Sequence, residues 1–205
     1  IRNLQVGCRE FLHPGWLNTD LARLKGPDGS MTNGGGLFEV GGGLYFEHDA
    51  TKPFPLPDGI FAVITSEHFI EHVAPDQAIA WLTEMQRILA PGGLLRVSTP
   101  DLALYCSGYL DPDQKFFREH AEILDTMIVE DIPDSRAWMV NQIFYGYGHR
   151  FIYDYDEIVR AFAAAGFDPS RARRAAFREG MIPQVAALDL EDRRDESVYA
   201  EITKA

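Results

Sequence analysis

The chain has 205 residues, of which 46% are hydrophobic and 24% are charged. This is the size and composition of one globular domain with a sizeable core, and no apolar run approaches the ~20 residues needed to cross a bilayer. The formal net charge of −12 disfavours nucleic acid as a partner, because an acidic surface repels phosphates. The cysteines, Cys8 and Cys106, show neither disulfide nor zinc spacing. We therefore expect a cytoplasmic protein without membrane contact, whose oligomeric state is left open.

Short apolar segments alternate with segments of helical periodicity along the chain. The predicted strands, two of which end in an aspartate, are 4–8, 15–20, 43–49, 61–66, 93–99 and 197–202. Helices are predicted over 76–89 and 156–165, where apolar residues recur at helical spacing and glycine or proline follows. Strands separated by helical crossovers predict an α/β fold, with a parallel sheet and helices on both faces.

Two regions are less regular, and we expect both to lie within one domain of residues 1–205. Residues 26–43 are rich in glycine and predict a loop; this loop is not a phosphate-binding loop, because no Gly-Lys-Ser/Thr follows. Residues 102–148 are rich in aromatic residues and predict a helical insertion after the fifth strand. The basic segment 171–174 indicates a solvated loop or a strand edge.

Aspartates stand where two neighbouring strands are predicted to end. In open α/β sheets, ligands bind beyond the carboxyl ends of the strands. Asp20 could accept both hydroxyl protons of a ribose there, and Asp49 could accept a proton from an adenine amino group. Alternatively, each aspartate caps the turn or helix that follows it. The sequence leaves both interpretations open.

Residues 66–73 read Ser-Glu-His-Phe-Ile-Glu-His-Val and follow the fourth predicted strand. They are typical of a helix start with Ser66 as its N-cap. They also contain His68, Glu71 and His72 in the H-x-x-E-H spacing of some zinc peptidases. A third ligand is not evident, so we expect no metal site and keep a metal-dependent hydrolase as an alternative.

The order of these segments resembles the class I S-adenosylmethionine-dependent methyltransferases. The similarity is carried by residues 54–59, 61–64 and 67–73, and most specifically by Arg-Ile-Leu-Ala-Pro-Gly-Gly at 87–93. Residues 148–154, with the helix after them, resemble uncharacterised members grouped with sugar or cell-envelope biosynthesis. The resemblance implies a Rossmann-like, doubly wound, mostly parallel seven-stranded sheet with an antiparallel last strand, and S-adenosylmethionine as cofactor.

The resemblance also implies cofactor-binding positions. Gly7 and Cys8, in the turn after the first strand, match positions near the methionine part of the cofactor. Asp20, after the second strand, matches the acid near the ribose, and Asp49 and Ala50, after the third strand, match the pair near the adenine. Ser66 and Glu67, after the fourth strand, match the pair near the sulfonium. One departure is Arg9-Glu10, where the family has further glycines that let the backbone approach the cofactor.

The implied reaction is methyl transfer to a small-molecule or sugar-like acceptor. An oxygen or nitrogen acceptor that loses a proton calls for a general base. We expect His149 in this role, because imidazole titrates near neutral pH, with Asp101, His68 and Tyr153 as further candidates. The aromatic residues between 105 and 153 either line a pocket or form ordinary core. A non-catalytic binding module with the same fold is the alternative, motivated by Arg9.

Overall fold

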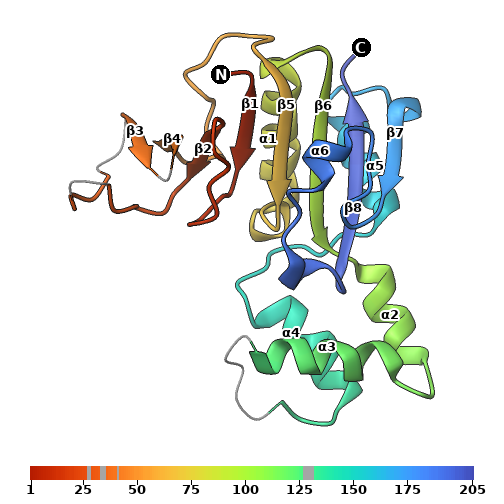
Figure 1. The fold of residues 1–205 in the computed structure, drawn as a ribbon. Helices are drawn as coiled ribbons and strands as arrows, with labels where there is room; N and C mark the ends of the chain where they lie inside the picture. Colours follow the sequence, from red (N-terminus) through yellow and green to blue (C-terminus); the bar gives the residue numbers. More distant parts are fainter. Residues whose placement is uncertain (27–28, 33–35, 41, 127–131) are drawn as a thin grey trace.

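The computed structural model describes residues 1–26, 29–32, 36–40, 42–126 and 132–205. Among these residues, one eight-stranded sheet runs through the molecule in the order β3-β4-β2-β1-β5-β6-β8-β7 (Figure 1). In that order the strands are Leu37–Val40, Gly43–Glu47, Leu17–Asp20, Asn3–Val6, Phe61–Glu67, Leu89–Pro100, Ser197–Thr203 and Ala172–Ala175.

Strands β4, β2, β1, β5 and β6 are parallel, whereas β3, β8 and β7 pair antiparallel at the two sides of the sheet. The predicted Rossmann-like α/β sheet, mostly parallel with an antiparallel last strand, is confirmed. It has eight strands instead of seven. Short β3 lies within the glycine-rich segment 26–43, and short β7 within the basic segment, so neither has the apolar run by which buried strands are recognised.

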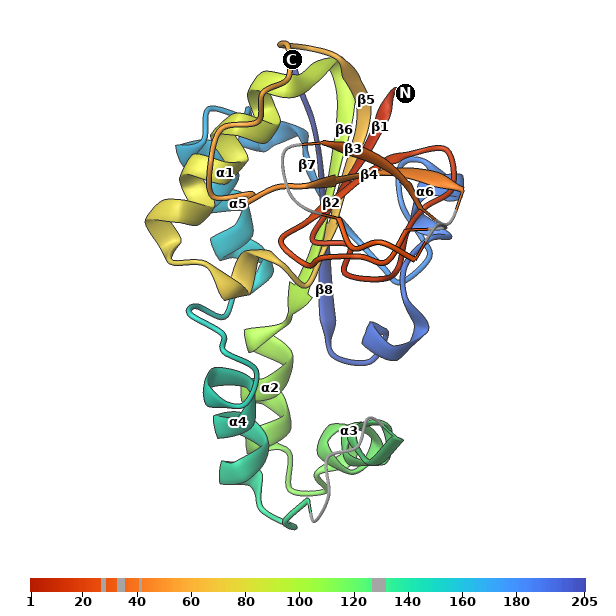
Figure 2. The same cartoon turned by 90° about the vertical axis from the view of Figure 1, so that its left-hand side faces the viewer.

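The two faces of the sheet are covered unequally. Helices α1 (Pro75–Ile88) and α5 (Tyr155–Ala164) pack on one face, and α6 (Pro183–Ala186) lies on the other (Figure 2). The main core lies under α1 and α5, where Trp81, Met85 and Phe162 are almost fully buried against the strands. The connection from β1 to β2 contains no helix, and this leaves the carboxyl ends of these strands accessible.

A helical layer lies beyond the end toward which β1, β5 and β6 point (Figure 1). It consists of α2 (Leu102–Leu110), α3 (Lys115–Thr126) and α4 (Arg136–Tyr145), within the segment 102–148. A second core holds the layer together, and several of the aromatic residues are part of it: Tyr105, Phe116, Phe117, Trp138 and Phe144. These five side chains are therefore ordinary core residues.

Parts of both irregular regions lie outside the described residues, namely 27–28, 33–35 and 41 in the glycine-rich segment and 127–131 in the helical one. Three 3₁₀ turns complete the chain: η1 (Ile70–His72), η2 (Pro169–Arg171) and η3 (Glu191–Arg193). None of the described helices combines the length and the apolar character that crossing a membrane requires.

Candidate functional site

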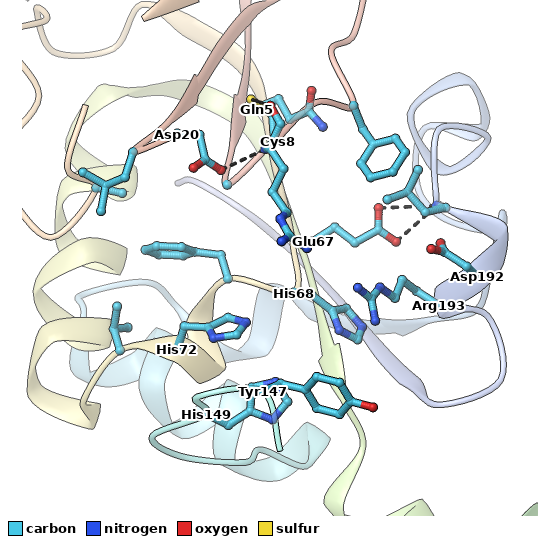
Figure 3. Close-up of a pocket in the computed structure, with 18 of the residues that line it drawn as sticks. Gln5, Cys8, Asp20, Glu67, His68, His72, Tyr147, His149, Asp192 and Arg193 are labelled. Atoms are coloured by element: carbon cyan, nitrogen blue, oxygen red, sulfur yellow. Dashed lines mark hydrogen bonds between the residues drawn. The ribbon is translucent and has the colours of Figure 1, made fainter. Parts of the chain in front are cut away.

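A cavity of about 650 Å³ opens at the carboxyl ends of the parallel strands. Its walls are the loop after β1, the end of β2, residues 48–51 after β4 and residues 67–73 after β5. Residues 190–196 before β8 close it on another side, and Leu124, Tyr147 and His149 come from the helical segment (Figure 3). The volume is ordinary for a small-molecule site. The strand ends singled out in the sequence therefore belong to one cavity.

Gly7 forms the turn by which the chain leaves β1. Its φ of +74° is rarely adopted by L-residues, and an added Cβ would lie 3.0 Å from the Phe69 Cβ. The Gly7 and Cys8 amides both donate to the Thr19 carbonyl, which ties the turn to β2. Because Gly7, Cys8 and Phe69 all line the cavity, a glycine at position 7 sets the shape of its wall.

We expect Gly7→Ala to lower the free energy of unfolding by more than the ~1–2 kcal/mol that a left-handed alanine costs, because Phe69 must also move. Gly15→Ala is the matched control: Gly15 has a similar φ of +78° but nothing within 4 Å of an added Cβ. Urea unfolding of both variants measures the difference. Equal losses would show that the Phe69 contact does not matter.

Asp20 is held at the rim of the cavity by backbone amides. One carboxylate oxygen accepts from the Arg9 amide at 2.8 Å (Figure 3). The other accepts from the Ala22 amide at 2.8 Å. Arg9 has a φ of +46°, so a non-glycine residue adopts the conformation for which the family uses glycine. The carboxylate thus caps the loop and also lines the cavity, and its role toward a ribose stays a prediction.

Asp49 also has a local partner. Its Oδ1 accepts from the Thr51 amide at 3.0 Å and from the Thr51 hydroxyl at 2.7 Å, and this bonding lowers the pKa of the Asp49 carboxyl. Asp49 therefore caps its turn, as the alternative interpretation had it. Asp49 and Ala50 nevertheless line the cavity on the side of Asp20.

Three other sequence candidates lie elsewhere. Ser66 lines a separate hollow of about 20 Å³ instead of the cavity. Asp101 is the N-cap of α2, accepting from the Ala103 amide at 3.0 Å and pairing with Arg174 at 2.8 Å. Tyr153 is buried in the main core. The structure therefore does not bring Ser66, Asp101 or Tyr153 to the cavity. Asp101 follows β6, and the end of β6 is not among the strand ends that line the cavity.

Glu67, at the end of β5, lines the cavity and is largely buried. Its carboxylate accepts from the Leu190 amide at 3.2 and 3.3 Å (Figure 3), and burial raises its pKa to about 7. Glu67 thus fastens the 190–196 segment to the strand end. That segment reaches the cavity because β8 runs antiparallel to β6, so the residues before β8 start at the carboxyl ends of the parallel strands.

Sequence reasoning missed Arg193 and Glu196, which both line the cavity. The available signal was the charged run 191–196 immediately before the last predicted strand. A charged run of this kind is usually a solvated surface, and only the antiparallel direction of β8 turns it inward.

His68, which lines the cavity, and the buried Glu71 are neighbours. Burial raises the pKa of Glu71 to about 8 and lowers the pKa of His68 well below its ordinary range. Glu71 Oε2 accepts from the Thr99 hydroxyl at 2.9 Å, and Oε1 lies 3.3 Å from His68 Nδ1. Glu71 Oε1 has no hydrogen-bond partner among the described residues, whereas His68 Nε2 donates to Ser197 Oγ at 2.7 Å.

These contacts remove the basis of the H-x-x-E-H interpretation. His68 Nε2 is already bonded to Ser197, and residue 68 has a φ of +50° ahead of a short 3₁₀ turn, where an α-helix would be needed to place His68 and His72 on one face. The metal-hydrolase alternative is not supported by the geometry of this set.

The pH dependence of stability reports on Glu71. Between its ordinary pKa of 4.5 and about 8, the folded protein holds a proton that the unfolded chain has released. This contribution to stability is complete below pH 4.5 and is lost as the pH rises through about 8. From pH 6.5 to 8 we expect Glu71 to contribute a loss on the order of 1–2 kcal/mol.

Glu71→Gln is expected to abolish that loss, since glutamine is neutral and keeps an acceptor for the Thr99 hydroxyl but does not titrate. Urea unfolding of both proteins at pH 6.5, 7.2 and 8.0 measures it. Glu67 titrates in both proteins, so its contribution cancels in the difference. Parallel pH profiles would contradict the assignment of a neutral buried acid.

His72 and His149 lie close together, on the opposite side of the cavity from Asp20 (Figure 3). Their ring centroids are 4.8 Å apart. Burial lowers the pKa of His72 to about 4 and also lowers the pKa of His149, so both rings are neutral at pH 7. His149 Nδ1 bonds the Ile143 carbonyl. A carbonyl only accepts, so Nδ1 carries the proton and Nε2 carries the lone pair.

The family described as "Methyltransferase domain" matches residues 22–171. The chain belongs to this family. The protein is therefore a methyltransferase. The family match does not extend to the branch linked to sugar or cell-envelope biosynthesis, and this branch stays a prediction.

Solved structures share the fold of this methyltransferase. An S-adenosylmethionine-dependent methyltransferase from Mesorhizobium loti is 16% identical, with 98% of this chain and 89% of that chain covered and a TM-score of 0.53. One from Archaeoglobus fulgidus is 13% identical, with 99% and 86% covered and a TM-score of 0.51. One from Thermotoga maritima is 16% identical, with 100% and 82% covered and a TM-score of 0.52. No curated protein matches the chain significantly.

Proposed function

We propose that this methyltransferase transfers a methyl group to a small-molecule or sugar-like acceptor that binds at the His149 end of the cavity. The observation that carries the proposal is one continuous cavity that runs from Asp20 and Asp49 to His149. Cofactor and acceptor need such a common space, because the acceptor atom must approach the methyl group in line. The resemblance of residues 148–154 to members grouped with sugar or cell-envelope biosynthesis supports a sugar-like acceptor.

The residues at the β1, β2 and β4 ends fit the cofactor. Gly7 leaves room where a Cβ would fill the wall, and Asp20 presents free lone pairs beside that turn. We assign the ribose hydroxyls to Asp20, the adenine to Asp49 and Ala50, and the methionine part to Gly7 and Cys8. When bound, S-adenosylmethionine supplies an electrophilic methyl group on a cationic sulfur.

His149 is the proposed general base. Its Nδ1 proton is held by Ile143, so Nε2 is the nitrogen able to take a proton. The acceptor hydroxyl or amine loses its proton to Nε2 as its oxygen or nitrogen gains the methyl group. Glu67 lies between the two ends of the cavity, and the amide of Leu190 fixes its orientation. We keep a cytoplasmic location, because Cys8 and Cys106 are both free thiols.

Titration with S-adenosylhomocysteine by calorimetry tests the proposal without knowledge of the acceptor. We expect one site with a micromolar dissociation constant, and an unchanged constant in His149→Ala, because that side chain lies at the acceptor end. Folded protein that does not bind the ligand would overturn the proposal and favour the non-catalytic module. Arg9, which stands where the family has glycine, would then be the first residue to replace with glycine.

A further inference from the structure

We propose that Glu71, His72 and His149 form a binding site for a divalent transition-metal cation at the acceptor end of the cavity. Each side chain offers one ligand atom, and these atoms all lie within 4.8 Å of one another. The role of the cation in methyl transfer rests on the proposed function, but its binding does not. The sequence predicted no metal site, because the third ligand comes from a distant segment.

The backbone holds the three residues together. Glu71 and His72 belong to η1, directly after β5, whereas His149 lies in the loop that follows α4. The carbonyl of Glu71 accepts from the Arg150 amide at 2.7 Å and from the Phe151 amide at 3.2 Å. These two bonds fix the His149 loop against η1, so the ligand cluster does not depend on mobile side chains alone.

The imidazole rings are oriented as metal-binding histidines usually are. His149 donates its Nδ1 proton to a backbone carbonyl, that of Ile143, and its Nε2 lone pair is free to ligate. His72 contacts the His149 ring and interacts with the Gly148 backbone. The Glu71 carboxyl is anchored by the Thr99 hydroxyl. Glu71 must release its proton to ligate, as acids do when they bind a metal.

The ligand set indicates the class of metal. Two imidazoles and one carboxylate suit zinc, cobalt, manganese or ferrous iron better than magnesium or calcium, which prefer oxygen ligands alone. Three protein ligands leave coordination positions open. His72 and His149 line the cavity, so an acceptor hydroxyl there could complete the coordination.

The cation would act on the acceptor as a Lewis acid. A metal-bound hydroxyl loses its proton at a lower pH than a free one. The Nε2 lone pair of His149 cannot take a proton and bind a metal at the same time. With the metal bound, His149 is therefore a ligand, and the cation would activate the hydroxyl, whose proton would leave to solvent water as its oxygen takes the methyl group. The acceptor class is accordingly one with an oxygen nucleophile.

The test is a titration of the whole chain, freed of metals by chelation, with Co²⁺ followed by visible absorption, and with Zn²⁺ followed by calorimetry. We expect one cation per chain with a micromolar or tighter dissociation constant, and cobalt bands typical of nitrogen and oxygen ligands. His72→Ala and His149→Ala should each weaken binding at least tenfold. His72 is only partly buried, so its variant should fold.

His48→Ala is the matched control, since His48 lines the same cavity outside the cluster, and its affinity for both cations should stay within twofold. The absence of cobalt bands, or bands that persist unchanged in both cluster variants, would overturn the proposal. Binding of S-adenosylhomocysteine is measured in parallel on the same samples. A protein that binds this ligand but no cation refutes the metal site alone, and one that binds a cation but not the ligand refutes the proposed function alone.

Discussion

Replacing Asp20 with alanine is expected to weaken the binding of S-adenosylhomocysteine about 10- to 100-fold. A hydrogen bond to a charged group contributes about 1.5–3 kcal/mol, and each 1.4 kcal/mol is about a factor of ten in affinity. In the proposed function Asp20 offers its remaining lone pairs to two ribose hydroxyls, and its carboxylate also holds the Arg9 amide that shapes the loop after β1. Calorimetric titration of both proteins measures the change.

Asp58→Ala serves as the control for Asp20→Ala. Like Asp20, Asp58 is an aspartate near the protein surface. It pairs with Arg87 at 2.5 Å, its side chain is 79% exposed, and it does not line the cavity. We expect its dissociation constant to stay within twofold of the original protein. An unchanged affinity in Asp20→Ala, with the fold intact, would place the ribose elsewhere.

Replacing Arg96 with leucine is expected to cost the fold about 3–5 kcal/mol, the largest stability effect we foresee. Arg96 stands in β6 and is only 2% exposed. Its guanidinium donates to Asp189 at 2.5 and 2.9 Å, to Glu201 at 2.7 Å, and to two backbone carbonyls, so all of its donors are engaged. Leucine would leave two buried carboxylates without a counter-charge.

Arg160→Leu is the matched control for Arg96→Leu. Arg160 pairs with Glu157 on the exposed surface of α5, where solvent screening leaves such pairs a small contribution to stability. Urea unfolding of the original protein, Arg96→Leu and Arg160→Leu at pH 7 measures the loss of stability in each variant. A loss below about 1 kcal/mol in Arg96→Leu would mean that water reaches the carboxylates.

The Arg96 cluster also illustrates what the sequence does not disclose. Arg96 lies within an apolar strand, and no local pattern distinguishes a buried arginine from one at a strand edge. Its partners come from the end of α6 and from β8, far along the chain. Only the antiparallel placement of β8 beside β6 brings Glu201 opposite Arg96, with which it is in register.

The same reason separates the predicted site residues that line the cavity from those that do not. Gly7, Asp20, Asp49 and Glu67 were predicted from the ends of strands whose order is fixed by the parallel sheet, and all of them line the cavity. Asp101 also follows a strand, but that strand is β6, whose end is covered by the start of α2. A position after a strand is informative only when the place of that strand in the sheet is known.

By itself, the sequence determined the fold class, the parallel sheet and the set of strand ends that carry acidic residues, because hydrophobic periodicity and glycine positions are local properties of the chain. The tertiary structure alone decided which strand ends share a cavity, how Arg96 is neutralised and which histidine joins Glu71 and His72. Those features depend on contacts between segments distant along the chain, and these contacts form only when the sheet is complete.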